Sequence, residues 1–291
     1  MKLLITGSSG FLGRNLVESF RNTDIDVTSL DKEGSPNIKA DLLKVTHLSS
    51  RHDVVLNLAA ISNVYVPPDQ EEFVINHNVQ SFCSSARIAK ASGAKLVIQA
   101  SSSSVYGYGE TPYSETIKCN PLGAYGKSKL ACEKASRLLE EDTGVKIINL
   151  RLHNLIGLYQ KKSMLPHLIF QAIDGKHELK LFGVTKRSWT PVEDLAYLIR
   201  AVCFSDYQSL SSIYNVGSES AVSQLELITI AETITGKQCP YTLVDKREFE
   251  MDITLPDMTQ LKDDFGYCVP IRTDSSFLYH SMENVYRTYN D

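Results

Sequence analysis

Residues 6–13 read TGSSGFLG and place glycines at positions 7, 10 and 13. They follow the apolar run Leu3–Thr6 and precede a stretch with helical periodicity, so they predict a turn from a strand into a helix. In such a turn the first glycine permits a tight bend, the second lets a pyrophosphate approach the backbone, and the third lets helix and strand pack closely. The spacing is GxxGxxG rather than GxGxxG. With its strand and helix in place, it favours a dinucleotide site over a plain glycine-rich turn.

Asp31 follows the second apolar run, Val27–Leu30, and closes the expected second strand. A carboxylate at this place can accept hydrogen bonds from both hydroxyls of an adenosine ribose, and it repels a 2′-phosphate. The sequence therefore predicts NAD as the cofactor. Lys32, the next residue, leaves NADP as the less favoured alternative.

The first half of the chain alternates apolar runs of strand length with stretches of helical periodicity. The runs are Leu3–Thr6, Val27–Leu30, Val54–Leu58, Leu96–Ala100 and Val145–Leu150. This alternation predicts an α/β fold with a Rossmann-type, doubly wound parallel sheet. We expect an NAD-binding domain over residues 1–152 and a smaller, mixed substrate-binding lobe over most of 153–291, with elements near 188–217 returning to the sheet. Later helices are expected at Met164–Asp174, Val192–Phe204, Ser223–Thr235 and from Asp274 onward.

Composition excludes several classes of partner. The chain is 43% hydrophobic with a net charge of −4, which is ordinary for a globular protein and offers no basic excess for nucleic acid. Its six cysteines form no CxxC pair, and none of its seven histidines has a metal-like partner at helical spacing, so we expect reduced thiols and no metal. No apolar stretch approaches the ~20 residues of a membrane span. We therefore expect a cytoplasmic protein.

Residues 125–129 read YGKSK and are expected to open a helix, with Tyr125 and Lys129 one turn apart on one face. A phenol, with an ordinary pKa of about 10, is a poor base at neutral pH, but a neighbouring ammonium and a positive nicotinamide ring both favour phenolate. The pair can therefore act as a general base. Tyr-x-x-x-Lys is frequent by chance, but here it follows Ser101–Ser104, just past an expected strand, where ligands bind in such folds.

Together these residues resemble the extended short-chain dehydrogenase/reductase family, in particular its NAD-dependent nucleotide-sugar epimerases and dehydratases of the UDP-glucose 4-epimerase type. The resemblance covers most of the chain and includes RLHNLIG at residues 151–157. It implies that Ser102, Tyr125 and Lys129 are catalytic, with Ser103 as a second choice for the hydroxyl. Asn57 stands where the family often has a histidine.

The resemblance also implies the residues that bind the two ligands. Asp41 and Leu42 would touch adenine, and Lys129 would hold the nicotinamide ribose as well. The implied cofactor residues are Gly7, Ser9, Gly10, Phe11, Leu12, Gly13, Asp31, Lys32, Asp41, Leu42, Leu58, Ala59, Ala60, Asn78, Ala100, Tyr125 and Lys129. The implied substrate residues are Ser62, Ser102, Ser103, Tyr125, Asn154, Met164, Phe182, Arg187, Arg247 and Glu250. The two arginines match positions that bind the substrate diphosphate, for which a guanidinium fork is well suited.

The implied reaction is epimerisation of a nucleotide-diphosphate sugar, most plausibly at C4 through a 4-keto intermediate. Dehydratases of the family carry Asp-Glu directly after the catalytic hydroxyl, but this chain has Ser103 and Ser104 there, which disfavours elimination. An NAD(P)H-dependent reductase of a 4-keto-6-deoxy nucleotide sugar stays open as an alternative. A non-catalytic dinucleotide-binding regulator is less favoured because Tyr125 and Lys129 are both present. The resemblance further implies a homodimer that pairs helices around Asn78–Ala91 and Tyr125–Glu141.

Overall fold

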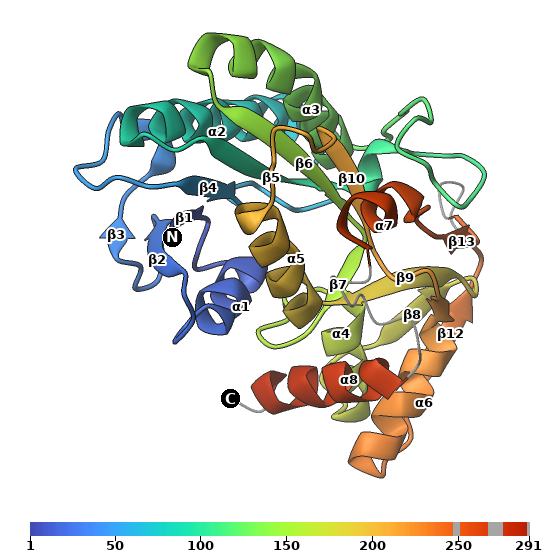
Figure 1. Cartoon of the computed structure of the whole chain (residues 1–291). Coiled ribbons are helices and arrows are strands. Elements are labelled where there is room, and N and C mark those ends of the chain that lie inside the picture. Colours follow the sequence, from blue (N-terminus) through green and yellow to red (C-terminus); the bar gives the residue numbers. More distant parts are fainter. Residues whose placement is uncertain (247–250, 267–275, 290–291) are drawn as a thin grey trace.

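The main sheet contains seven parallel strands in the order β3-β2-β1-β4-β5-β6-β10 (Figure 1). The computed structural model describes residues 1–246, 251–266 and 276–289. The strands are β1 (Lys2–Thr6), β2 (Asp26–Asp31), β3 (Ile38–Lys39), β4 (Val54–Asn57), β5 (Leu96–Ser102), β6 (Lys146–Leu152) and β10 (Ile213–Val216). The strand order reverses between β1 and β4, so the crevice at the carboxyl ends of these two strands is where a ligand is expected.

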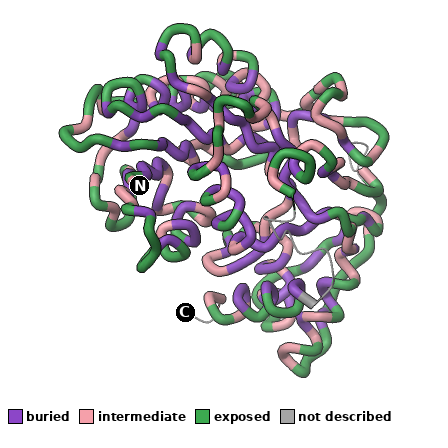
Figure 2. Tube along the Cα trace, viewed as in Figure 1, coloured by how far each residue is buried: buried purple, intermediate pink, exposed green. Residues whose placement is uncertain are grey.

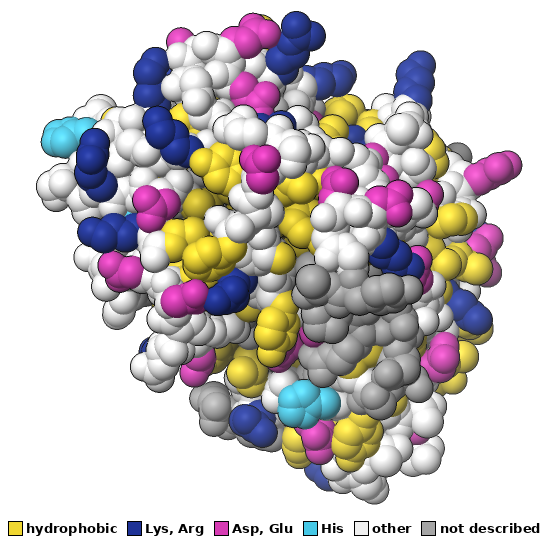
Figure 3. Space-filling model, in the orientation of Figure 1, with side chains coloured by type: hydrophobic (Ala, Val, Ile, Leu, Met, Phe, Trp, Pro, Cys, Tyr) yellow, Lys and Arg dark blue, Asp and Glu magenta, His cyan; other side chains and the backbone are white. Residues whose placement is uncertain are grey.

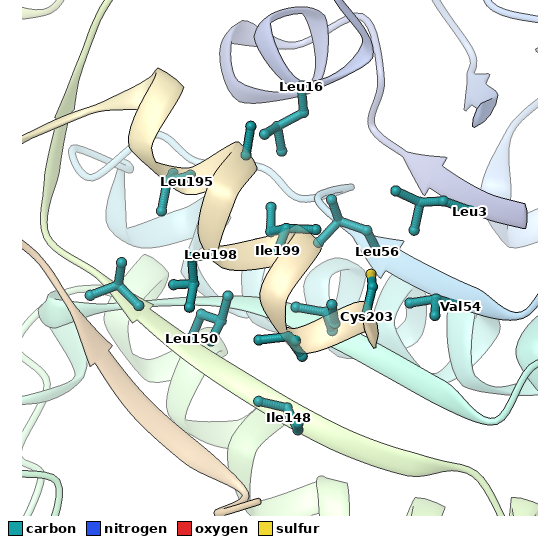
Figure 4. Close-up of a cluster of buried hydrophobic side chains, with 14 of the residues drawn as sticks. Leu3, Leu16, Val54, Leu56, Ile148, Leu150, Leu195, Leu198, Ile199 and Cys203 are labelled. Carbon is teal, nitrogen blue, oxygen red and sulfur yellow. The ribbon is translucent and has the colours of Figure 1, made fainter. Parts of the chain in front are cut away.

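Two helical layers cover the sheet. Helices α1 (Phe11–Ser19) and α5 (Val192–Phe204) lie on one face, and α2 (Glu71–Ser92) and α3 (Ala124–Thr143) on the other (Figure 1). Side chains of β1 alternate between these layers: Leu3 packs with α1 and α5 (Figure 4), Ile5 lies in the same cluster, and Leu4 packs with α2 and α3. Because all three are fully buried, each contributes roughly 1.5–3 kcal/mol of burial free energy.

A second, smaller core lies beyond the carboxyl ends of the main sheet. One sheet of this core contains β7 (Asn154–Ile156), β9 (Lys186–Pro191), β11 (Ala221–Ser223) and β13 (Ile253–Thr254). A separate two-stranded sheet consists of β8 (Leu179–Phe182) and β12 (Tyr241–Val244). Helices α4 (Leu165–Ile173), α6 (Gln224–Thr235) and α8 (Ser276–Tyr289) pack around it, while α7 (Thr259–Phe265) lies against β10. Pairing is mixed because β11 runs antiparallel to β9. In Figure 2 the buried residues follow the strands of both cores.

The predicted α/β fold class is confirmed. Helix α5 has the predicted bounds, and α4 and α6 lie inside the predicted ranges. The sequence predicts that elements near 188–217 return to the main sheet. Within this range, β10 is a strand of that sheet and α5 packs on it, whereas β9 belongs to the smaller sheet. The division of the chain at residue 152 stays a prediction.

Two surface properties complete the description. Within the described ranges, no helix combines the length and the apolar character that crossing a bilayer demands. On the face shown in Figure 3, Lys and Arg side chains are interspersed with Asp and Glu side chains.

Candidate active site

The turn between β1 and α1 has the backbone geometry of a phosphate cradle. Gly7 has φ +69°, and a Cβ there would lie 2.7 Å from the backbone nitrogen of Ala59. A Cβ on Gly13 would overlap the Gly7 carbonyl oxygen. Gly10 precedes the first residue of α1, and no side chain caps that end. The amino end of α1 therefore has room and donors for the diphosphate of a dinucleotide, so these residues fit NAD.

The Asp31 carboxylate lies against this turn at the carboxyl end of β2. Its Oδ2 accepts from the Ser9 backbone N–H at 2.9 Å, and its Oδ1 accepts from the Glu33 N–H at 3.0 Å. Each oxygen keeps a further acceptor site for a ribose hydroxyl. Lys32 is exposed beside it.

The stretch implied to touch adenine is also at this edge of the sheet. The Asp41 side chain caps the short 3₁₀ helix η1 (Leu42–Lys44) by accepting from the Leu43 N–H at 3.1 Å. Leu42 is buried in the core under α2. We propose that adenine meets the backbone of this stretch rather than the Leu42 side chain.

Asn78 on α2 supports the cofactor crevice from behind. Its Oδ1 accepts from the Ile61 N–H at 2.8 Å, and its Nδ2 donates to the Ile61 carbonyl at 3.0 Å and to Ser128 Oγ at 2.9 Å. Both amide hydrogens are therefore used within the protein. We propose that Asn78 positions the loop after β4, whose residues are Leu58, Ala59 and Ala60; its contact with the cofactor stays a prediction.

Tyr125 and Lys129 lie one turn apart at the start of α3. The Lys129 ammonium lies 5.6 Å from the centre of the Tyr125 ring and donates to the Ala100 carbonyl at 2.7 Å. Lys129 is buried and Tyr125 is half-buried. The structure thus holds the ammonium next to the phenol and to the strand end that carries the serines.

Ser102 ends β5 and caps the 3₁₀ helix η3 (Ser103–Val105). Its Oγ accepts from the Ser104 N–H and donates to Ser104 Oγ, both at 3.1 Å. Gly126 allows η3 to approach α3, because a Cβ there would overlap the Ser104 carbonyl oxygen. The first turn of α3 and the serines therefore meet at one end of the sheet.

A buried ion pair beneath this junction was missed by the sequence reasoning. Glu133 on α3 accepts from Arg151 Nε at 3.0 Å and Nη2 at 2.8 Å, and from Ser101 Oγ at 2.5 Å. Arg151 Nη1 also donates to the Tyr106 hydroxyl at 3.0 Å. Burial lowers the pKa of Arg151, but the hydrogen bonds and charge of Glu133 outweigh it and raise that pKa. Glu133 is eight residues after Tyr125, which places both on one helix face and is the signal that could have found it.

The structure describes all but two of the residues that the resemblance implies for substrate binding. Three of them are half-buried near element ends: Asn154 on β7, Met164 before α4, and Phe182 on β8. Arg187 on β9 is half-buried and donates to the carbonyls of Lys186 at 3.0 Å and Met251 at 2.8 Å. Arg247 and Glu250 lie outside the described residues.

Two further side chains, His153 and Lys161, belong to the segments before and after β7. His153 is fully buried, which lowers its pKa to about 3 and keeps the ring neutral. Lys161, to which no motif pointed, donates to Ser62 Oγ. Across the ranges with described coordinates, no cluster of His, Cys, Asp and Glu could hold a metal ion.

Comparison with known proteins gives consistent matches. The model of the NAD dependent epimerase/dehydratase family matches residues 3–217. A UDP-glucose 4-epimerase from Lactobacillus helveticus is 25% identical, with 92% of each chain covered. A dTDP-4-dehydro-6-deoxyglucose reductase from Escherichia coli is 25% identical over 81% of this chain and 82% of its own. Among solved structures, MoeE5 in complex with UDP-glucuronic acid and NAD superposes with a TM-score of 0.87 at 25% identity, covering 100% of this chain and 99% of MoeE5.

Proposed function

The chain belongs to the NAD dependent epimerase/dehydratase family, and on that basis we propose that it is an NAD-dependent epimerase of nucleotide-diphosphate sugars. The carbon inverted is C4, and the reaction passes through a 4-keto sugar. One observation carries the proposal: the Tyr125 and Lys129 pair meets the serines that end β5, on the same sheet whose first turn fits a dinucleotide diphosphate.

Each catalytic side chain has a distinct task in this reaction. Tyr125, as phenolate, accepts the proton of the sugar hydroxyl, and the adjacent Lys129 ammonium stabilises that negative charge. Ser102 donates a hydrogen bond to the sugar oxygen as it becomes a carbonyl. NAD, when bound, accepts a hydride from the sugar carbon and returns it. Inversion requires that the keto sugar present its other face before the hydride returns.

Elimination of water would need an additional acid and base beside the hydroxyl. Ser103 and Ser104 occupy those positions and form the η3 turn. The first carboxylate along α3, Glu133, is buried and paired with Arg151. These features support epimerisation over dehydration.

A reductase of a 4-keto-6-deoxy nucleotide sugar is the second candidate. The observation that favours it is the similarity to the Escherichia coli reductase, which extends over 81% of this chain. The same three side chains would serve, but the cofactor would be exchanged at every turnover. Retention of cofactor therefore separates the two candidates.

The ligands and the assembly are proposed from the same observations. Asp31, which faces the turn, supports NAD over NADP. The uridine diphosphate ligand of MoeE5 makes UDP-sugars the first substrates to test. The resemblance supports a homodimer through α2 and α3, on which Phe73 and Leu138 are 62% and 68% exposed. Sedimentation analysis of the wild type and of Leu138→Asp tests this dimer, because a buried carboxylate would dissociate it.

The function is tested by denaturing purified protein, measuring released NAD by mass spectrometry, and assaying UDP-, dTDP-, GDP- and CDP-hexoses. We expect bound NAD and inversion at C4 of one sugar without added cofactor. Tyr125→Phe should abolish inversion while the protein still binds NAD. A protein that consumes NADPH or NADH with a 4-keto sugar is a reductase, and full activity in Tyr125→Phe would contradict the assignment of the base.

A further inference from the structure

Lys161 reaches from the segment that follows β7 to the loop that follows β4. Its ammonium donates to the hydroxyl of Ser62, which is 99 residues away in the chain. The contact joins the part of the chain expected to bind substrate to the sheet expected to bind the dinucleotide. Holding the flexible lysine side chain in one hydrogen bond costs conformational entropy, so the position of its charge calls for a physical reason.

The segment that carries Lys161 is fixed against helix α1. Asn15 Nδ2 donates to the Leu158 carbonyl at 2.7 Å. The Arg14 guanidinium lies 3.8 Å from the centre of the Tyr159 ring, and the Tyr159 hydroxyl donates to Glu18 at 2.8 Å. Tyr159 also has φ +60°, a conformation that non-glycine residues keep only where surrounding contacts enforce it. Lys161 is therefore two residues beyond a point held on the helix whose amino end fits the diphosphate.

The other partner, Ser62, is on the loop that follows β4, and this loop contacts the glycine turn. Ala59, three residues earlier, lies so close to Gly7 that a Cβ on the glycine would be 2.7 Å from its nitrogen. Asn78 binds both backbone groups of Ile61, at 2.8 and 3.0 Å. One end of the contact is on a segment fixed to α1, and the other is on the loop that touches the glycine turn, so the Lys161 ammonium lies where these two segments meet.

A further feature of Lys161 is the surroundings of its charge. No carboxylate within the described ranges lies at ion-pair distance from its ammonium, whereas many surface lysines here have one, such as Lys127 with Glu71. Solvent reaches the side chain, yet enough protein surrounds it that burial lowers the pKa of Lys161. An exposed ammonium without a carboxylate partner among the described residues is a binding group for an anion.

We propose that Lys161 binds the diphosphate of the dinucleotide, approaching it from the side opposite the glycine turn. The inference rests on the proposed cofactor, and it adds a residue that no motif assigned. The turn offers neutral N–H donors, so Lys161 supplies a full positive charge at that group. A charge-assisted contact from a second direction slows dissociation, which suits an epimerase that keeps one NAD through each cycle.

The test compares Lys161→Met with Lys162→Met, because Lys162 is adjacent and exposed. NAD binding to cofactor-free protein is measured by titration calorimetry at two salt concentrations, and UDP binding is measured in parallel. We expect Lys161→Met to weaken NAD binding about tenfold and to lower its salt dependence, since one charge-assisted hydrogen bond is lost. Lys162→Met should match the wild type, Lys161→Arg should retain most of the affinity, and UDP affinity should stay the same in all variants.

The outcomes separate this inference from the proposed function. If the wild type binds no NAD, the proposed function fails. If the wild type binds NAD and Lys161→Met binds it equally well at both salt concentrations, only the inference is wrong. Weaker UDP binding with unchanged NAD binding would move Lys161 to the substrate diphosphate and contradict the proposal. Should Lys161→Met not fold, Lys161→Arg and Lys161→Gln give the same comparison of charge at nearly constant length.

Discussion

Replacing Glu133 by glutamine removes the negative charge from the buried ion pair beneath the active site while nearly preserving the shape of the side chain. Glu133 and Arg151 have only 3% and 4% of their side chains exposed, so the arginine would be left buried without a counter-charge. Two bonds from Arg151 and one from Ser101 end on this carboxylate. Breaking a buried pair of this kind costs about 3–5 kcal/mol. We expect Glu133→Gln to lower the free energy of unfolding by that amount.

Urea unfolding followed by circular dichroism measures the effect, and a loss of this size moves the midpoint by roughly 1–2 M. The same helix offers a matched control, because Glu141 pairs with Arg137 at 3.1 Å but both side chains are mostly exposed. Glu141→Gln should cost at most about 0.5 kcal/mol.

A double variant separates the lost attraction from the stranded charge. Glu133→Gln combined with Arg151→Met removes both charges, so it should be more stable than Glu133→Gln alone. A loss below about 1 kcal/mol in Glu133→Gln, or a double variant as unstable as the sum of both single changes, would refute this account of the pair.

Three further changes test other parts of the site. Gly7→Ala places a Cβ 2.7 Å from the Ala59 nitrogen at φ +69°, so NAD binding by calorimetry and the melting temperature should both fall; an unchanged variant would contradict the cradle. Asp31→Ala should reduce the preference for NAD over NADP in paired titrations, and an unaltered ratio would show that this carboxylate does not select. His153 is neutral when folded, with a pKa of about 3, and an unfolded histidine takes up a proton near pH 6.5. Uptake of this proton should therefore lower the free energy of unfolding by about 1.4 kcal/mol for each pH unit below 6.5. His153→Phe should remove this contribution to the pH dependence, because about one proton fewer is taken up on unfolding.

Local patterns in the sequence determined the fold class and the two motifs. Glycines at 7, 10 and 13 between a strand and a helix favour a tight turn with close packing, and short apolar runs that alternate with helical stretches favour buried parallel strands. The spacing of Tyr125 and Lys129 likewise fixes their shared helix face. These inferences needed only neighbours within a few residues, which is why they could be drawn without tertiary contacts.

Contacts between distant segments were decided only by the tertiary structure. The amide of Asn78 binds Ile61 and Ser128, and the sequence pattern predicts neither contact. Lys161 belongs to no motif, and its meeting with Ser62 depends on how the segment after β7 packs on α1. A hydrogen bond across 99 residues leaves no periodic trace in the sequence, because its geometry is set by the packing of whole elements. The order of residues therefore determined the turn and the helix that carries Tyr125 and Lys129, and packing decided which distant side chains meet around them.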